Sequence, residues 1–158
     1  MSSFEEGLKI IEETCGNGKD NVISLATIAI EPNVDGKPRP CVRDVDAYFE
    51  NGVFYVVTWG NSNKMQQIAL NPEVAFTACF EGFSGNGIGK NLGWVLEPKN
   101  AELRTKLRTV FANWYDDAND ETDENCCILA IHLTSGTIFR DHGAVRYTLD
   151  FVNKVVVS

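Results

Sequence analysis

The sequence has few basic residues and no long apolar run. It carries 14 Lys and Arg against 22 Asp and Glu, a formal net charge of −8. A nucleic-acid-binding protein needs a basic face to neutralise phosphates, so this balance argues against nucleic acid as a partner. No apolar segment approaches the roughly 20 residues that span a bilayer. The acidic, amphipathic start MSSFEEGLKIIEE is unlike a signal peptide. We therefore expect a cytoplasmic protein that does not associate with membranes.

Signals for metal, disulfide and triad chemistry are equally scarce. The five cysteines show no CxxC or paired Cys/His spacing, so we expect no metal site. Cys126 and Cys127 are adjacent and would point to opposite faces of one strand, which argues against a disulfide between them. Neither His132 nor His142 has a nearby acid and nucleophile in the sequence, so we expect neither to be catalytic. The catalytic residues stay unassigned.

Short apolar, β-branched segments separated by turn residues run along most of the chain. Strands are expected at 22–30, 41–49, 53–58 and 73–80, and Asn51-Gly52 is a strong hairpin signal. A capping box at Ser3 and Glu6 predicts a first helix, and Pro98 opens a helix expected over 98–118. The glycine-rich segment 82–93 is expected to be a loop, flexible over a ligand or needed for a turn. The last third, from residue 126, is expected to be a β-meander that turns at Ser-Gly and His-Gly.

These patterns predict a single domain over 1–158 of mainly β structure with helices (α+β). Six or seven antiparallel strands without regular βαβ alternation favour a small closed barrel with helices packed outside.

The segment Thr58–Phe76, TWGNSNKMQQIALNPEVAF, leads from a strand directly into a short helix. A helix N-terminus offers unpaired N–H groups and the positive end of the helix dipole, which together suit a phosphate. Asn61 or Ser62 would cap this helix. Ser62 would donate a hydroxyl to the phosphate, and Lys64 would add a full charge. Arg43 lies one hairpin earlier, on the same strand face as Val45. The segment therefore predicts a small dianion pocket, unless Arg43 and Lys64 are separate solvated charges.

The same positions resemble a known family. The pattern Thr58-x-x-x-Ser62-x-Lys64-x-x-Gln67-Ile68-x-x-Asn71-Pro72-x-Val74 is similar to the flavin-phosphate segment of the pyridoxamine 5′-phosphate oxidase-like split barrels. Arg43-x-Val45 resembles the strand of that family that contacts the flavin, and the similarity covers roughly residues 22–80. The resemblance implies a six-stranded antiparallel split β-barrel of Greek-key type that binds FMN. It also implies a homodimer with two cofactors at the interface.

The resemblance assigns the phosphate of FMN to Arg43, Ser62 and Lys64. Asn63 stands where the family has an arginine between the serine and the lysine, which leaves one cation fewer at this site.

The resemblance also implies contacts with the rest of the cofactor. Asp44 and Val45 would lie along the isoalloxazine ring through backbone groups. Thr58 and Gln67 would contact the ribityl chain or the ring, and Trp94 of the partner subunit would lie near the ring.

The expected function is FMN binding in a flavin-dependent oxidoreductase that acts on an unidentified small molecule. The true oxidases of vitamin B6 end in an arginine-containing segment that holds the substrate, and YTLDFVNKVVVS has none. The chain is therefore expected not to be that oxidase. Three alternatives stay open: a non-catalytic flavin-binding or sensing protein, a haem-binding protein, and a deazaflavin-dependent reductase.

Overall fold

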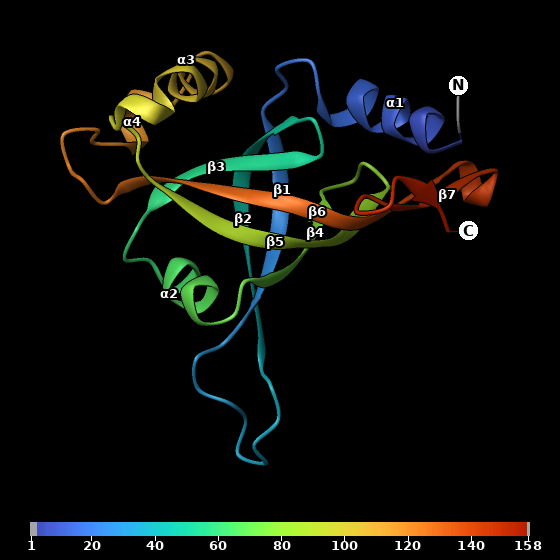
Figure 1. Ribbon diagram of the computed structural model, residues 1–158, viewed down its shortest axis with the longest axis horizontal. Coiled ribbons are helices and arrows are strands. Elements are labelled where there is room, and N and C mark those ends of the chain that lie inside the picture. The colour runs from blue at the N-terminus through green and yellow to red at the C-terminus, as the bar shows by residue number, and fades with distance from the viewer. Residues whose placement is uncertain (1–2, 158) are drawn as a thin grey trace.

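Eight strands form one antiparallel sheet in the computed structural model, which describes residues 3–157 (Figure 1). They are β1 (Asn21–Ile28), β2 (Pro40–Glu50), β3 (Val53–Trp59), β4 (Glu73–Ala78), β5 (Phe83–Trp94), β6 (Cys126–Arg140), β7 (Val145–Asp150) and β8 (Val155–Val156). Their order is β3-β2-β1-β4-β5-β6-β7-β8, and β3 also pairs with β6. This extra pairing closes β1 to β6 into a barrel and leaves neither β3 nor β6 with an open edge there. The predicted α+β fold with a six-stranded barrel is confirmed.

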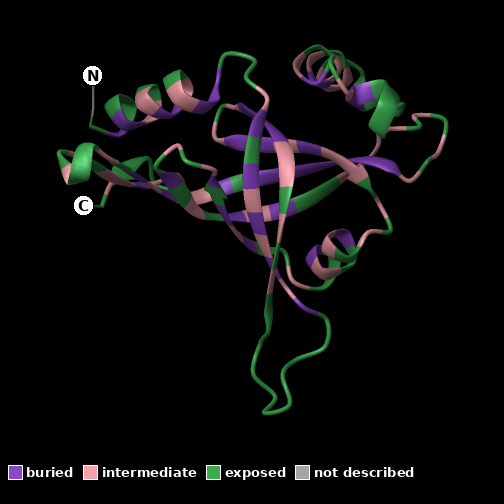
Figure 2. Ribbon diagram, turned by 180° about the vertical axis from the view of Figure 1, so that it is seen from behind, coloured by how far each residue is buried: buried purple, intermediate pink, exposed green. Residues whose placement is uncertain are grey.

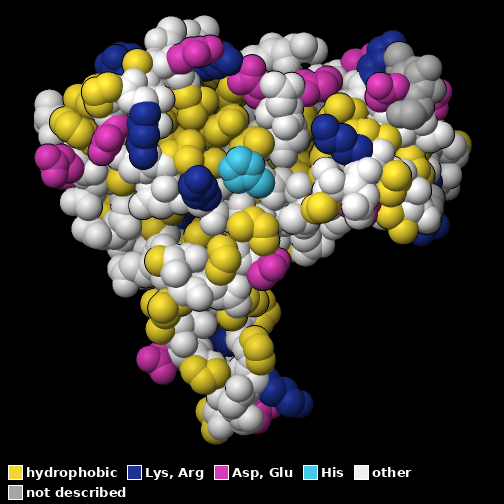
Figure 3. Space-filling model, viewed as in Figure 1, with side chains coloured by type: hydrophobic (Ala, Val, Ile, Leu, Met, Phe, Trp, Pro, Cys, Tyr) yellow, Lys and Arg dark blue, Asp and Glu magenta, His cyan; other side chains and the backbone are white. Residues whose placement is uncertain are grey.

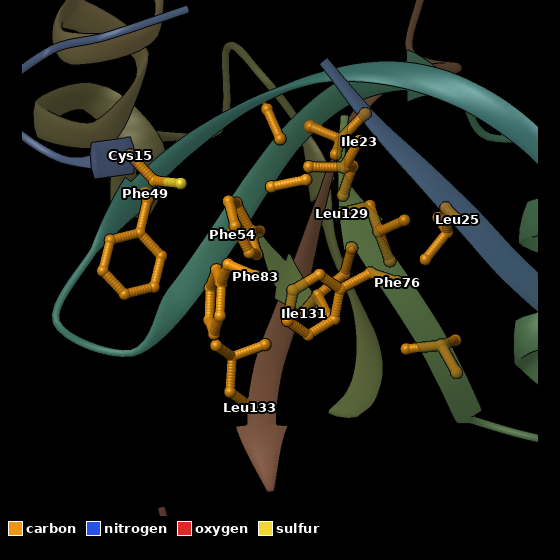
Figure 4. Close-up of a cluster of buried hydrophobic side chains, with 14 of the residues drawn as sticks. Cys15, Ile23, Leu25, Phe49, Phe54, Phe76, Phe83, Leu129, Ile131 and Leu133 are labelled. Atoms are coloured by element: carbon orange, nitrogen blue, oxygen red, sulfur yellow. The ribbon is translucent and has the colours of Figure 1, made fainter. Parts of the chain in front are cut away.

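Alternating inward side chains fill the barrel. On β1, Ile23 and Leu25 are fully buried, and they meet large side chains from the other strands. The rings of Phe54, Phe76 and Phe83 form the centre, with centroids 5.1 Å, 5.2 Å and 6.3 Å apart (Figure 4). Such tilted and edge-on aromatic pairs stabilise a core beyond the area that they bury.

Four α-helices lie outside the barrel in the described part of the chain. They are α1 (Ser3–Cys15), α2 (Asn63–Leu70), α3 (Ala101–Val110) and α4 (Tyr115–Ala118), with a 3-10 turn at Pro98–Asn100 before α3. Helix α1 adds Phe4 and Ile11 to the core cluster of the barrel. A second cluster forms where Leu107 and Phe111 pack over the outer face of β6. None of the helices within residues 3–157 is long and apolar enough to cross a lipid bilayer.

The helix expected over 98–118 is broken, because α3 ends at Val110 and α4 begins only at Tyr115. Between them the rings of Phe111 and Trp114 lie 4.7 Å apart, and the Trp114 indole donates to Asp20 at 2.8 Å. The chain leaves the helical path here and makes this tertiary contact with the turn before β1 instead.

The prediction of a loop at 82–93 is wrong, because these residues form β5, between β4 and β6. Two of the glycines, Gly85 and Gly87, are needed for close approach to β6. A Cβ at Gly85 would lie 2.1 Å from the carbonyl oxygen of Ser135, and one at Gly87 would lie 2.8 Å from that of His132. The register also shifts between Asn86 and Gly87, as in a β-bulge.

The turn expected at Ser135-Gly136 is also wrong, since both residues lie inside the long strand β6. The chain turns instead at Asp141–Gly143, which confirms the turn expected at His-Gly. Adjacent Cys126 and Cys127 do face opposite sides, one in the cluster beneath α3 and the other in the barrel core.

We expect Gly85→Ala to destabilise the protein, because its methyl group would overlap the backbone of β6. Overpacking of a well-packed site costs about 1–3 kcal/mol, and the backbone contact here leaves little room to relax. Denaturant unfolding of the two single variants Gly85→Ala and Ser84→Ala measures this, since Ser84 is the exposed neighbour on the same strand. Equal stability of the two variants would show that β5 and β6 do not approach so closely.

Candidate functional site at the N-terminus of α2

Helix α2 begins where β3 leaves the barrel. The N–H of Gly60 donates to the carbonyl of Asn125 at 2.7 Å, and that of Ser62 donates to the carbonyl of Trp59 at 3.0 Å. Ser62 has extended backbone angles (φ −64°, ψ 158°) and is the N-cap. Asn71 ends the helix, and Pro72 follows. The predicted helix and its ends are therefore confirmed.

The N-terminus of α2 keeps unused donors. The first N–H that finds an acceptor in the helix is that of Gln66, bonded to the carbonyl of Ser62 at 3.0 Å. A serine N-cap usually accepts an N–H of the first turn, but the Ser62 hydroxyl makes no such bond. Its oxygen is buried and has no hydrogen-bond partner among residues 3–157. A buried hydroxyl without a partner costs about 1–3 kcal/mol, which a ligand oxygen at this point would recover.

Lys64 lies half-buried in the first turn of the same helix. Burial lowers the pKa of its ammonium group, and the charge of Arg43 lowers this pKa further. Within residues 3–157, neither cation forms an ion pair with a carboxylate. Lys64 is therefore a partly desolvated cation that feels the charge of a second cation, and neither has a carboxylate partner in the described chain. This arrangement is unfavourable unless an anion binds there.

Arg43 points inward from β2 and is fixed by three acceptors. Its guanidinium donates to the carbonyl of Leu25 at 3.1 Å, to Thr27 Oγ1 at 2.7 Å and to Gln67 Oε1 at 2.9 Å. The hydroxyl of Thr27 also donates to Gln67 Oε1. Burial lowers the pKa of Arg43. A guanidinium carries five donors, so some remain for a ligand.

This arrangement gives Gln67 a role that the resemblance did not assign. Its side-chain oxygen is used by Arg43 and Thr27, and its nitrogen lies 3.9 Å from the sulfur of Cys41. Thr27 is only 1% exposed and was missed by sequence reasoning. The one signal for it is a hydroxyl inside the otherwise apolar run VISLATIAI.

The remaining expected residues lie on β2, β3 and α2. Val45 is inward and packs against the barrel core, whereas Asp44 is outward and accepts a hydrogen bond from Ser24 Oγ at 2.6 Å. Thr58 is half-buried near the end of β3, and Asn63 is exposed at the start of α2.

Trp94 packs within the cluster beneath α3. Its indole N–H donates to the carbonyl of Glu121 in the same chain at 2.8 Å. It has no hydrogen bond to the group around Arg43, so its contact with a cofactor stays a prediction about a partner subunit.

No protein-family model matches the sequence, and no curated protein sequence matches it. Solved structures do share its fold. A pyridoxamine 5′-phosphate oxidase-related, FMN-binding protein from Nostoc punctiforme is 15% identical, with a TM-score of 0.61 over 95% of this chain and 91% of that protein. General stress protein 26 from Bacillus anthracis is 17% identical, with a TM-score of 0.58 over 81% of this chain and 89% of that protein.

A heme-binding protein from Mycobacterium smegmatis is also similar. It is 11% identical, with a TM-score of 0.64 over 92% of this chain and 59% of that protein. At such identities the likeness establishes the shared fold. The resemblance to the pyridoxamine 5′-phosphate oxidase-like split barrels is thus confirmed at the level of the fold.

We expect Gln67→Ala to loosen Arg43 and to lower the free energy of unfolding. The change removes the acceptor of both Arg43 and Thr27, and a buried donor left unpaired costs about 1–3 kcal/mol. Gln66→Ala is the matched control, because Gln66 is exposed one position earlier on the same helix and should change stability by about 0.5 kcal/mol or less. Chemical denaturation compares the two variants, and a larger loss for Gln66→Ala would contradict the assignment.

Proposed function

We propose that this protein binds FMN through the phosphate group at the N-terminus of α2 and serves as a flavin-dependent oxidoreductase for a small molecule. One observation carries the proposal. Arg43 and Lys64, two partly desolvated cations without a carboxylate partner in the described chain, lie with the unpartnered hydroxyl of Ser62 at a helix N-terminus.

These residues fit a phosphate dianion in charge and in hydrogen bonding. The phosphate would accept from the Ser62 hydroxyl, from the first-turn N–H groups and from the free donors of Arg43. Its negative charge would relieve the repulsion between Arg43 and Lys64 and raise the pKa of Lys64 back towards its usual value. Asn63 adds no charge, so two cations would neutralise the dianion.

The chain's own residues bind and orient the cofactor in this proposal. The flavin, when bound, supplies the redox chemistry. Thr27 and Gln67 hold the guanidinium of Arg43 in place, and Val45 continues the same inward face of β2. The FMN-binding neighbour from Nostoc punctiforme supports this choice of cofactor.

We also place the flavin ring at the interface of a homodimer. Arg43 and Lys64 are only half-buried in one chain, so the end of the cofactor beyond the phosphate would reach the surface. A second subunit would cover it, as the resemblance implies.

Haem is the second candidate, and one observation favours it. A hollow of about 640 Å³ is lined by apolar residues, Phe4, Leu8 and Phe151 among them, and by polar residues that include His132 and Lys154. Histidine is a common haem ligand, and the similar heme-binding protein makes the test necessary.

An absorbance spectrum after gel filtration separates the two candidates. The protein is loaded with FMN or with haem and freed of unbound ligand. Retained flavin bands support FMN, and their bleaching by NADH or NADPH supports an enzyme. A retained Soret band, with no flavin retained, would show that the ligand is haem and not FMN.

The phosphate site makes a sharper prediction about FMN and riboflavin, which differ only in the phosphate. Lys64→Ala and Arg43→Ala should each weaken FMN binding about tenfold to a hundredfold, since a hydrogen bond to a charged group contributes roughly 1.5–3 kcal/mol. Ser62→Ala should lose less, because the N–H groups of the helix remain. Riboflavin affinity should stay unchanged in all three variants. Fluorescence-quenching titrations of both flavins measure these constants.

Lys90→Ala is the control for a general effect of charge, because Lys90 is an exposed cation on β5. It should leave FMN affinity within about twofold at physiological salt, where distant surface charges are screened. Equal FMN affinity for wild type and Lys64→Ala would show that Lys64 is a solvated charge and would contradict the proposed phosphate site.

A further inference from the structure

A hydrogen bond ties the turn between α3 and α4 to the barrel. The indole N–H of Trp114 donates to Asp20 Oδ2 at 2.8 Å, and the rings of Trp114 and Phe111 lie 4.7 Å apart. Asp20 is the last residue before β1. Figures 1 and 2 show the turn before β1 between α1 and α3. The bond therefore fastens the two helices to the chain that enters the barrel.

Few side chains attach α3 and α4 to the rest of the protein. Within residues 101–118 only Leu107, Phe111 and Tyr115 are buried, and the other residues are intermediate or exposed (Figure 2). A segment with few buried contacts opens at a lower free energy than the core. A contact at Trp114 can therefore decide how firmly both helices are docked.

A second carboxyl group lies beside the acceptor of Trp114. Val22 is opposite Asp46 in the pairing of β1 with β2, and side chains two positions apart share a face, so Asp20 and Asp46 lie on the same side of the sheet. Their carboxyl groups are within hydrogen-bonding reach of each other. Asp20 Oδ1 is buried and has no hydrogen-bond partner among residues 3–157. Two carboxyl groups can bond to each other only when one of them carries a proton.

The surroundings of Asp46 favour such a proton. Burial, followed by the hydrogen bond and the charge of Asp20, raises the pKa of Asp46 to about 6. Neither Asp20 nor Asp46 forms an ion pair in the described part of the chain. A protonated Asp46 would donate to Asp20 Oδ1, while Asp20 Oδ2 accepts from Trp114. Both oxygens of Asp20 would then have a donor.

The charged groups on the neighbouring turn and on α3 are already paired. Their ion pairs, at 2.7 to 2.9 Å, are Lys19 with Glu81, Lys106 with Glu50 and Arg108 with Asp116. Asp117, next in α4, is exposed. Figure 3 shows acidic and basic side chains interspersed over the face that carries α1 and α3. Asp20 and Asp46 differ from these pairs because they meet each other without a cation.

The remaining titratable groups on the elements around the pair supply no cation either. On β2, Asp44 accepts a hydrogen bond from Ser24 at 2.6 Å. Burial raises the pKa of Tyr48 to about 12 and also raises that of Tyr55, so both are neutral in the physiological range. On α1, burial raises the pKa of Glu12. A proton is thus the positive charge that relieves the contact of the two carboxyl groups.

We propose that Asp20 and Asp46 form a pH-sensitive latch that fastens α3 and α4 to the barrel. In the closed latch one proton lies between the two carboxyl groups, and Asp20 accepts from both Asp46 and Trp114. Loss of this proton to solvent leaves two carboxylates in contact, and their repulsion separates Asp20 from Asp46 and loosens the turn at Trp114. The latch is closed below about pH 6 and open above it. This inference does not depend on FMN.

Proton–nitrogen NMR of the indole groups tests the latch at Trp114 itself. The chain has three tryptophans, and Trp114→Phe identifies the Trp114 resonance. This resonance should shift with a midpoint near pH 6 in the wild type. In Asp46→Asn the transition should vanish, because the amide donates to Asp20 Oδ1 at every pH. Both histidines remain in that variant, so their titration cannot explain the difference.

Glu73→Gln is the matched control, because it removes the same charge from an exposed site on β4. The Trp114 transition should stay in place in this variant.

The stability of the protein should follow the same proton. A carboxyl group whose pKa is higher in the folded chain stabilises the fold fully below its unfolded pKa, about 3.9 for Asp, and loses this contribution as the pH rises through about 6. Asp46→Asn keeps the hydrogen bond without a proton. Its unfolding equilibrium constant, relative to that of the wild type, should therefore fall about tenfold between about pH 5 and about pH 8. Denaturant unfolding measures both constants.

Two results would overturn the proposal. One is a Trp114 resonance of the wild type that does not shift between about pH 4.5 and about pH 8, and the other is a transition with an unchanged midpoint in Asp46→Asn. Carbon NMR of the aspartate carboxyl groups in the wild type decides the question if Asp46→Asn does not fold. One carboxyl group should titrate near pH 6, and titration of every one below about pH 5 would show that no proton is shared.

Discussion

The pairing of β3 with β6 is the contact on which the rest of the molecule depends. It runs from Val53 opposite His132 to Trp59 opposite Cys126 and turns an open sheet into a barrel. Closure gives β2 an inward face, so Arg43 is held among Leu25, Thr27 and Gln67 instead of lying in solvent. It also brings the end of β3 to the rim of the barrel, where the chain turns at Gly60 into α2. The candidate phosphate site is therefore a consequence of how the barrel closes.

The electrostatics of that rim run against the charge of the whole chain. With a net charge of −8, the protein repels anions at a distance, so an anion site needs concentrated positive charge and little competition from carboxylates. Arg43 and Lys64 supply this; burial lowers the pKa of each, and the charge of Arg43 lowers the pKa of Lys64 further. The buried, unpartnered hydroxyl of Ser62 also costs free energy. Residues that destabilise the free protein in this way commonly mark a binding site, because the ligand recovers the lost energy.

The sequence predicts those turns and helix ends that depend on the backbone preferences of a few neighbouring residues. Asn51 and Gly52 both adopt positive φ, as a two-residue hairpin turn requires, and β2 and β3 pair across them as expected. Ser62 and Asn71-Pro72 likewise bound α2 as their backbone preferences indicate. The charge of Arg43 lowers the pKa of Lys64, and the phosphate site that the sequence predicts from these two residues stays a prediction.

The features that the sequence did not predict depend on distant contacts. The glycines of β5 have the composition of a loop, and only the approach of β6 to Gly85 explains them in a strand. Thr27 is an ordinary strand residue until Gln67, 40 positions later, meets its hydroxyl. The break after Val110 follows from the bond between Trp114 and Asp20, which are 94 positions apart. In each case tertiary packing overrides a local preference.

The central claim is that Arg43, Ser62 and Lys64 bind the phosphate of FMN, and phosphorus NMR of that group tests it most directly. A free phosphomonoester takes up its second proton with a pKa of about 6. We predict that the bound FMN phosphate gives a shifted resonance and stays a dianion well below that pH, because two cations and a helix N-terminus favour the charged form. A flavin whose ring fluorescence is quenched by the protein while its phosphate titrates as in free FMN would contradict the account.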